Sequence, residues 1–304
     1  MQIFLTYCGV ILSLSVFPSV PVRISRLLGE PSVTSLQGRM DAAWFRANNP
    51  QACPQQCDCP IQWPTALYCD HKGLADIPDS LPNRTQYLFL QVEQTLTWTL
   101  RWGNFQICIF SIFSKANNIS SLSSSFLTKL TALRWLILDH NQLQELVALQ
   151  TQTQMYYFFA NHNHLRSVPS TLPAGLKELR LAHNQISSIN SLRGFLKLKY
   201  LRLSHCGLQS SNVYQQVFNF TSLVELDLSH NKLKTIPTVA TTLQYLYLEA
   251  NEIQDFNVNS FCRHWGPLSY SRMKILRLEG NKISYQQLPS NWVFCLRVLE
   301  SIYI

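Results

Sequence analysis

Cysteines near the amino terminus are the residues whose type and spacing most clearly point to chemistry. Four of them follow the spacing Cys53-x3-Cys57-x-Cys59-x9-Cys69, and two more lie late in the chain, at Cys262 and Cys295. Thiols spaced in this way form disulfides in exported proteins, whereas in the cytosol they bind zinc as a four-thiolate site. The choice between these two chemistries therefore depends on the compartment of the chain.

Two features of the sequence indicate export. The first 22 residues carry no charged side chain, and Ile3 to Phe17 is almost wholly apolar, as in the core of a secretory signal. The other interpretation, a membrane-spanning helix, is disfavoured because Pro18 and Pro21 would interrupt it. Three sequons for Asn-linked glycosylation begin at Asn83, Asn118 and Asn219. We therefore predict a secreted glycoprotein that contains disulfides and no membrane span.

Five of the eight histidines recur at regular intervals and form a column: His140, His162, His183, His205 and His230. Such a column suits zinc binding or a strip whose charge changes with pH. The alternative is that a solvated turn position merely tolerates histidine. We adopt the alternative, because no carboxylate or cysteine recurs beside the column, and we predict no metal site.

Motifs of catalysis are absent from the sequence. It contains no G-x-S-x-G, H-E-x-x-H, P-loop or G-x-G-x-x-G motif, so we predict neither an enzyme nor a bound cofactor. The 25 Lys and Arg residues exceed the 17 Asp and Glu residues and give a net charge of +8. This excess indicates polyanionic neighbours such as sulfated glycans. No run of five or more Lys or Arg residues occurs, which argues against nucleic acid as a partner.

An internal repeat sets the elements that must position these residues. The pattern L-x-x-L-x-L-x-x-N-x-L recurs, and its ninth position is taken by Asn141, Asn163, Asn184, Cys206, Asn231, Asn251 and Asn281. Residues at positions four and six point inward from a short parallel strand, and stacking the repeats buries them in one core. The Asn side chains satisfy backbone groups inside the turns. We predict a β-rich leucine-rich-repeat solenoid of the α/β type, with a curved parallel sheet on its concave face.

The chain divides into predicted parts along this pattern. They are a signal peptide (1–22), a basic tail (23–52), a cysteine-rich cap (53–84), about eight repeats (85–283) and a carboxyl-terminal cap with an enlarged penultimate repeat (262–304). Residues 92–115 interrupt the repeats in this division. Removing these 24 residues joins Gln91 to Ala116 and restores the register. We interpret the segment as translated intron, and the alternative is a binding loop everted from one repeat.

The cysteine spacing, the repeats and the Cys262–Cys295 tail together resemble the small leucine-rich repeat proteoglycans, and the x9 spacing resembles their second class. The resemblance covers residues 53–91 and 116–304. It implies disulfides between Cys53 and Cys59, between Cys57 and Cys69, and between Cys262 and Cys295. It also implies binding to fibrillar collagen, control of fibril growth, and keratan sulfate on Asn-linked glycans, for which Asn219 matches a family position.

The sequence departs from this family in three places. Members usually have more repeats than the eight counted here. The class carries an acidic, tyrosine-rich amino-terminal tail, whereas residues 23–52 contain no Tyr and are basic. A Glu/Lys pair that binds collagen in one class member falls at Lys282 and Ser284, so that site does not carry over.

Positions three, five and seven of each repeat point outward from the core and form the candidate binding face. Exposed aromatic rings beside alternating charges suit a rod-like partner such as collagen. The candidates are Tyr200, Arg202, Glu225, Asp227, Tyr245 and Tyr247. For Phe89 and Phe159 the sequence supports equally well the simpler interpretation, in which rings pack over one another across strands.

The sequence therefore predicts a secreted extracellular-matrix proteoglycan that binds fibrillar collagen and regulates fibril assembly and spacing. Sulfated glycans and growth factors are further candidate partners. The alternative function is a leucine-rich-repeat recognition protein that sequesters a growth factor or a microbial ligand.

Overall fold

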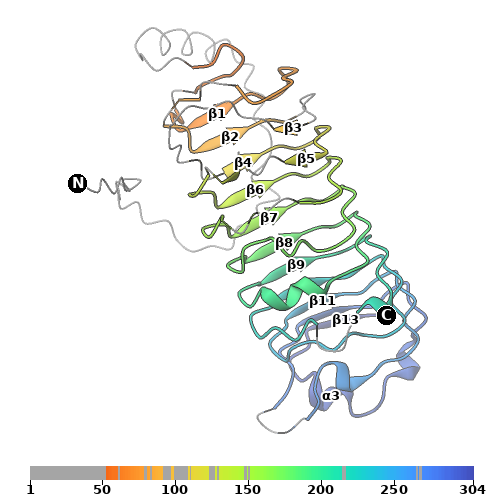
Figure 1. Ribbon diagram of the computed structural model, residues 1–304. Helices are drawn as coiled ribbons and strands as arrows, with labels where there is room; N and C mark the ends of the chain where they lie inside the picture. Colours follow the sequence, from red (N-terminus) through yellow and green to blue (C-terminus); the bar gives the residue numbers. More distant parts are fainter. Residues whose placement is uncertain are drawn as a thin grey trace.

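The computed structural model describes residues 53–304 except 61, 79–80, 83, 92–96, 99–108, 110, 123–126, 129, 147–148, 150, 214–216, 265 and 267–268. The predicted signal peptide, the basic tail, Asn83 and Cys108 lie outside the described residues. Figure 1 shows the rest as a stack of coils from an amino-terminal to a carboxyl-terminal cap. Among the described residues, no helix combines the length and apolar composition needed to cross a membrane.

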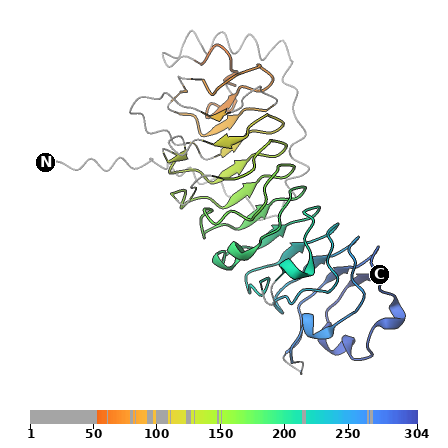
Figure 2. The same cartoon turned by 45° about the vertical axis from the view of Figure 1, so that its right-hand side comes forward.

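One parallel sheet of eleven short strands runs through the described part of the chain, in the order β1-β2-β4-β6-β7-β8-β9-β10-β11-β12-β13. The turned view of Figure 2 shows the same ladder of strands continuing into the carboxyl-terminal cap. The strand bounds are β1 Ala66–Tyr68, β2 Tyr87–Phe89, β4 Ser111–Phe113, β6 Trp135–Ile137, β7 Tyr157–Phe159, β8 Glu178–Arg180, β9 Tyr200–Arg202, β10 Glu225–Asp227, β11 Tyr245–Tyr247, β12 Ile275–Arg277 and β13 Ser301–Tyr303. A separate pair joins β3 (Thr97–Trp98) to β5 (Ser121–Leu122).

The core lies behind this sheet and is made by the repeat leucines. The middle residue of each strand is position four of its repeat, and the register aligns these residues, so that Leu179 pairs with Leu201 and Leu201 with Leu226. All three are fully buried. Each contributes roughly 1.5–3 kcal/mol of transfer free energy, which only neighbouring repeats can supply. The predicted leucine-rich-repeat solenoid is confirmed.

The buried asparagines connect each repeat to its neighbour. Asn163 Nδ2 donates to the Leu138 carbonyl at 2.9 Å, and its Oδ1 accepts the Leu143 N–H at 3.0 Å. These bonds satisfy backbone groups that the turns would otherwise leave unpaired. Cys206 replaces Asn in one repeat, and its buried thiol lies 3.3 Å from the Leu181 carbonyl. Burial raises the pKa of this thiol to about 12.

The residue before each asparagine turns the chain with a positive φ. This φ lies between 52° and 58° at Ala116, His140, His162, His183, His205, His230 and Ala250, and it is 73° at Gly280. The backbone N–H of this residue donates to the next repeat, as His162 N–H does to the Ala182 carbonyl at 2.9 Å. Left-handed backbone is costly for most side chains but is tolerated by His and free for Gly. Alanine at two of these positions shows that the turn itself does not require histidine.

The return segments between strands contain extended chain and short helices. The described helices are η2 (Asn190–Gly194), η3 (Ser210–Asn212), η4 (Val258–Ser260), η5 (Tyr285–Gln287) and α3 (Trp292–Cys295). None is long enough to dominate the convex side, so the described repeats are rich in β-structure.

Disulfides close both ends of the core. The structure joins Cys53 to Cys59 and Cys57 to Cys69 beside β1, and Cys262 to Cys295 beside α3. All six half-cystines are buried. These are the pairs that the family resemblance implied. Each closed loop stabilises the fold by about 2–4 kcal/mol, mainly because it restricts the unfolded chain.

The predicted insert at residues 92–115 differs from the structure at its carboxyl end. Ser111–Phe113 forms β4 and lies in the sheet between β2 and β6, with Ile112 aligned to Leu88 and Leu136. Ile109 and Ile112 are fully buried, and Asn117 joins the asparagine column through the Leu90 carbonyl. The prediction that this whole segment stands outside the repeats is therefore wrong.

The cause of the error is the length of the segment. Twenty-four residues equal about one repeat, so removing any complete repeat leaves the register intact. The sequence Ile109-x-x-Ile112-x-Ser114-x-x-Asn117-x-Ile119 is a repeat in which Ile and Ser replace Leu. Strands β2, β4 and β6 to β12 thus form nine repeat strands in the described residues, one more than the sequence count.

Candidate functional site

The outward side chains at positions three, five and seven form one continuous surface over the strands, called the sheet face below. Its amino-terminal half, over β1 to β7, is aromatic. Parallel rings stack at centroid distances of 4.4 Å between Tyr68 and Phe89, 4.6 Å between Phe89 and Phe113, and 3.7 Å between Trp135 and Tyr157. Phe89 is only 6% exposed. For this residue the structure favours the interpretation in which rings pack across strands.

Phe159 marks the end of the aromatic half. It is also only 6% exposed, and the Arg180 guanidinium lies over its ring, 4.4 Å from the centroid. Arg180 in turn forms an ion pair with Glu178 on the same strand. The aromatic half therefore passes directly into a half built from charged side chains.

The carboxyl-terminal half of the sheet face, over β8 to β12, is organised by ion pairs. Arg202 Nη2 and Nε donate to the same oxygen of Glu225, at 2.9 and 3.2 Å. The Arg202 side chain is 41% exposed and that of Glu225 is 17% exposed. The pair is therefore held in place by strand neighbours, while part of the guanidinium faces solvent.

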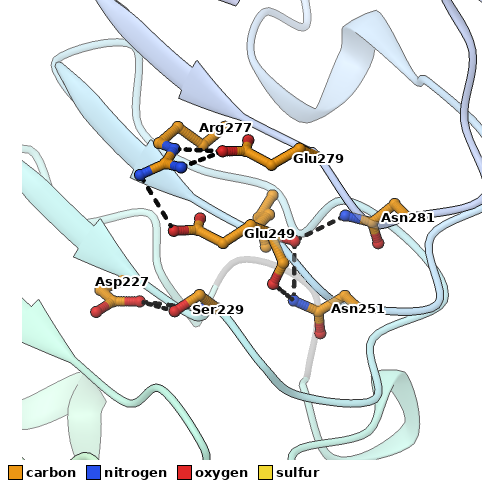
Figure 3. Close-up of polar contacts among 8 residues, drawn as sticks. Asp227, Ser229, Glu249, Asn251, Arg277, Glu279 and Asn281 are labelled. Atoms are coloured by element: carbon orange, nitrogen blue, oxygen red, sulfur yellow. Dashed lines mark hydrogen bonds and ion pairs between the residues drawn. The ribbon is translucent and has the colours of Figure 1, made fainter. Parts of the chain in front are cut away.

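A second charged group lies further along the same half (Figure 3). Arg277 Nε donates to Glu279 at 2.7 Å, and Arg277 Nη1 lies 3.6 Å from Glu249. The second carboxylate oxygen of Glu249 and that of Glu279 have no hydrogen-bond partner among the described residues. Burial, with the nearby charges of Asp227 and Glu279, raises the pKa of Glu249 despite the Arg277 guanidinium. The unpartnered oxygens are buried, so these carboxylates serve mainly to hold the Arg277 guanidinium in place.

The structure brings the six predicted binding residues together on three adjacent strands. Tyr200 and Arg202 lie on β9, Glu225 and Asp227 on β10, and Tyr245 and Tyr247 on β11, with Glu225 aligned between the two position-three tyrosines. Tyr200 is 37% exposed, and the other tyrosines are half-buried. Asp227 accepts the Ser229 hydroxyl at 2.7 Å. The prediction selected none of Arg180, Glu249, Arg277 and Glu279, whose outward positions follow from the same repeat pattern.

The histidine column forms a stack of rings along the edge where the strands end. Ring centroids are 4.1 Å apart between His140 and His162, 4.0 Å between His162 and His183, and 4.1 Å in the next two steps to His205 and His230. All five residues are exposed. In the described part of the chain, no group of three or more metal-ligating side chains is arranged to hold a metal ion.

A shallow hollow lies between this column and the sheet face. Its lining is polar and includes Arg180, Arg202, Asn161 and Ser204, together with the first three histidines of the column and the carboxylates of Asp139 and Asp227. Asp139 accepts two hydrogen bonds from Asn161, at 2.7 and 3.0 Å. Burial raises the pKa of Asp139 even so.

Two of the three glycosylation candidates lie in the described residues. Asn118 and Asn219 are exposed, and the side-chain oxygen Oδ1 of Asn118 accepts a 3.3 Å hydrogen bond from Gln142 Nε2. Both side chains are therefore at the surface that glycosylation requires.

Comparison with known proteins places these features among leucine-rich-repeat proteins. Residues 52–82 match the leucine rich repeat N-terminal domain, and residues 222–240 match the leucine rich repeat. Bovine (Bos taurus) fibromodulin is 35% identical over 306 residues, covering 84% of this chain and 81% of the relative. Bovine lumican is 36% identical over 302 residues, covering 83% and 88%.

A solved structure agrees on the fold. One chain of the octameric complex of latrophilin 3, Unc5D and FLRT2 has a TM-score of 0.67 at 23% identity, covering 82% of this chain and 83% of that one. The sequence of the carboxyl-terminal half looks most like lumican, with keratocan and fibromodulin next. Over the matched residues, fibromodulin and lumican have nearly equal identities to this chain.

Proposed function

The chain belongs to the class II small leucine-rich repeat proteoglycans, the extracellular-matrix family of fibromodulin and lumican, and from this we propose that it is secreted, binds fibrillar collagen and regulates fibril assembly and spacing. The observation that carries the proposal is the charged half of the sheet face. There tyrosines and ion-paired charges occupy successive strands over β9 to β11. Such a surface suits a rod with exposed side chains of both signs.

The spacing of the strands supports an extended partner. Neighbouring strands lie ~4.8 Å apart, so the six candidate residues form a compact patch within a longer face of the same character. The patch continues to Arg277 and Glu279 at one end and to Arg180 and Glu178 at the other. Partly exposed Tyr and Arg side chains are the types that contribute most to protein interfaces. The partner would therefore lie across several rungs.

Asn-linked glycans complete the proposed role. We place them at Asn83, Asn118 and Asn219, with keratan sulfate as the family's modification. Bulky, sulfated chains would keep neighbouring fibrils apart. Deglycosylation should therefore leave collagen binding in place and reduce the spacing between fibrils.

Turbidity of assembling collagen fibrils tests the proposal. The purified secreted chain should slow assembly and give thinner fibrils in electron micrographs. A variant carrying Arg202→Ala, Asp227→Ala and Tyr245→Ala should bind collagen about tenfold or more weakly, as expected when interface anchors are truncated. Arg263→Ala, Asp255→Ala and Tyr285→Ala remove the same three side-chain types from exposed positions elsewhere and should have no effect.

Binding that both triple variants retain would refute the proposed face. No binding by the folded, glycosylated wild-type chain would refute the collagen proposal. The alternative, a recognition protein that sequesters a growth factor or a microbial ligand, would then be preferred, since the same charged surface also suits a compact soluble partner.

A further inference from the structure

The histidine column is built as a strip of equivalent groups. Each ring is held by the same left-handed turn and the same backbone hydrogen bond to the next repeat. The ring faces are covered by neighbouring rings, in four steps of 4.0 to 4.1 Å. The three central rings are therefore covered on both faces, and a ligand can contact them only at their edges. Ala116, Ala250 and Gly280 take this position in the outer repeats, so the fold does not need histidine there.

None of the three central histidines follows a carboxylate in the sequence. The residue before each is neutral: Asn161 precedes His162, Ala182 precedes His183, and Ser204 precedes His205. The carboxylates that act on these rings are Asp139, at His162, and Asp227, at His205. Both are already bonded, Asp139 to Asn161 and Asp227 to Ser229. The cationic groups that face the strip are Lys115 at one end, and Arg180 and Arg202 across the hollow.

We propose that this strip is a proton-gated binding site for sulfated polysaccharide. Protonation turns each central ring into a cation with two N–H donors, and Asp139 and Asp227 supply only part of the counter-charge for the three rings. A linear polyanion lying along the strip supplies the rest through charge-assisted hydrogen bonds. Arg180 and Arg202 add donors from the hollow, since each ion pair with glutamate occupies only part of the guanidinium.

The surroundings favour a sulfated polysaccharide over other polyanions. Nucleic acid bases need free aromatic faces, and the imidazole faces are covered by stacking. An acidic peptide is normally recognised with pockets for its other side chains, whereas the hollow beside the strip is shallow and lined by polar groups. A repeated sulfate group needs only a line of donors, and the strip offers one.

The gating follows from the electrostatics of the stack. Burial lowers the pKa of His162, His183 and His205, and the positive charge of neighbouring histidines lowers it further, although Asp139 opposes the shift at His162 and Asp227 opposes it at His205. These rings are therefore neutral near pH 7.5 and become charged only in an acidified medium. A bound polyanion stabilises the protonated rings, so binding must be accompanied by uptake of protons.

Calorimetry with heparin as the probe tests the inference on the full, secreted chain. Affinity should rise about tenfold or more between pH 7.5 and pH 5.5, which is the effect of 1.4 kcal/mol. Titrations in two buffers of different ionisation enthalpy should reveal proton uptake at pH 6. A variant carrying His162→Asn, His183→Asn and His205→Asn should lose both the pH dependence and the proton uptake. Asn tolerates the left-handed turn, so this variant should fold.

The chain supplies a matched control in the three histidines outside the strip. Replacing His71, His164 and His264 by Asn makes the same change in charge at exposed positions and should leave the pH dependence intact. Binding that is independent of pH, or that the strip variant retains in full, would overturn the inference. Equal affinity for poly-glutamate would assign the strip to acidic peptides instead. The collagen assay is independent of these titrations, so failure of one proposal is distinguishable from failure of the other.

Discussion

The two halves of the sheet face use the same backbone for opposite purposes. Over β1 to β7 the outward side chains are largely aromatic and stack on one another, so that Phe89 and Phe159 are almost as buried as the core leucines. Over β8 to β12 they are charged and paired, and Arg202 and Arg277 each keep about two fifths of the side chain exposed. An outward position in a solenoid is therefore not by itself a binding position.

The difference shows where stability and recognition lie. Stacked rings remove apolar surface from water and stiffen the end next to the amino-terminal cap. Exposed ion pairs contribute little to stability, because solvent screens them, but they hold charges at fixed places. We therefore expect substitutions in the aromatic half to affect folding, and substitutions in the charged half to affect binding.

The largest expected effect comes from opening the aromatic half. Phe89→Ala removes a ring stacked between Tyr68 and Phe113 and should lower the free energy of unfolding by about 3 kcal/mol. Tyr245→Ala, in the charged half, should lower it by only about 1 kcal/mol. Denaturant unfolding followed by circular dichroism measures both. Equal losses of unfolding free energy would show that the aromatic half contributes no more to stability than the charged half.

The next effect concerns the place where the asparagine column is broken. Cys206→Asn should raise the free energy of unfolding by about 1 kcal/mol, because an amide supplies two strong donors and an acceptor where the thiol has one weak donor. The same experiment on Asn184→Cys should give the reverse sign. A neutral or destabilising result for Cys206→Asn would mean that the neighbouring repeats have adjusted to the smaller side chain.

A smaller effect is expected from the ion pair in the charged half. A double-mutant cycle with Arg202→Gln and Glu225→Gln should give a coupling free energy of about 0.5 kcal/mol in low salt and less in high salt. Collagen binding should fall in both single variants even though stability hardly changes. A coupling free energy of several kcal/mol would show that this ion pair stabilises the fold, as the stacked rings do.

The sequence predicts the buried positions of the repeats better than the exposed positions of the sheet face. Positions four and six and the asparagine column follow from a period that packing enforces, so Leu201 and Asn231 could be assigned before the structure was known. The repeat pattern does not identify Ser111–Phe113 as a strand, because Ile and Ser replace the repeat leucines there. The ion-pair partner of Arg202 cannot be predicted from the sequence either. The strand register aligns Arg202 with Asp227, yet the Arg202 side chain donates to Glu225. Which carboxylate an arginine pairs with depends on its side-chain rotamer and on several neighbouring residues at once.

The smallest expected effect is the pH dependence of stability at the histidine strip, which borders both halves. In the unfolded chain a histidine has a pKa near 6.5, and in the fold the pKa of His162, His183 and His205 is lower. Below pH 6.5 the unfolded state therefore binds more protons than the folded state. The free energy of unfolding should fall as the pH falls through this window and level off below the folded pKa values.

The strip variant with three asparagines isolates this contribution. Its free energy of unfolding should decline less than that of the wild-type chain between pH 7.5 and pH 5.5, while the variant lacking His71, His164 and His264 should follow the wild type more closely. Asp139, whose pKa is raised by burial, is present in all three proteins, so only the part of its titration that is coupled to His162 differs between them. Heparin should reverse the loss in the wild type, because a ligand that binds the protonated fold stabilises it. If acid destabilised all three proteins equally, protonation of the stacked rings would not be coupled to folding.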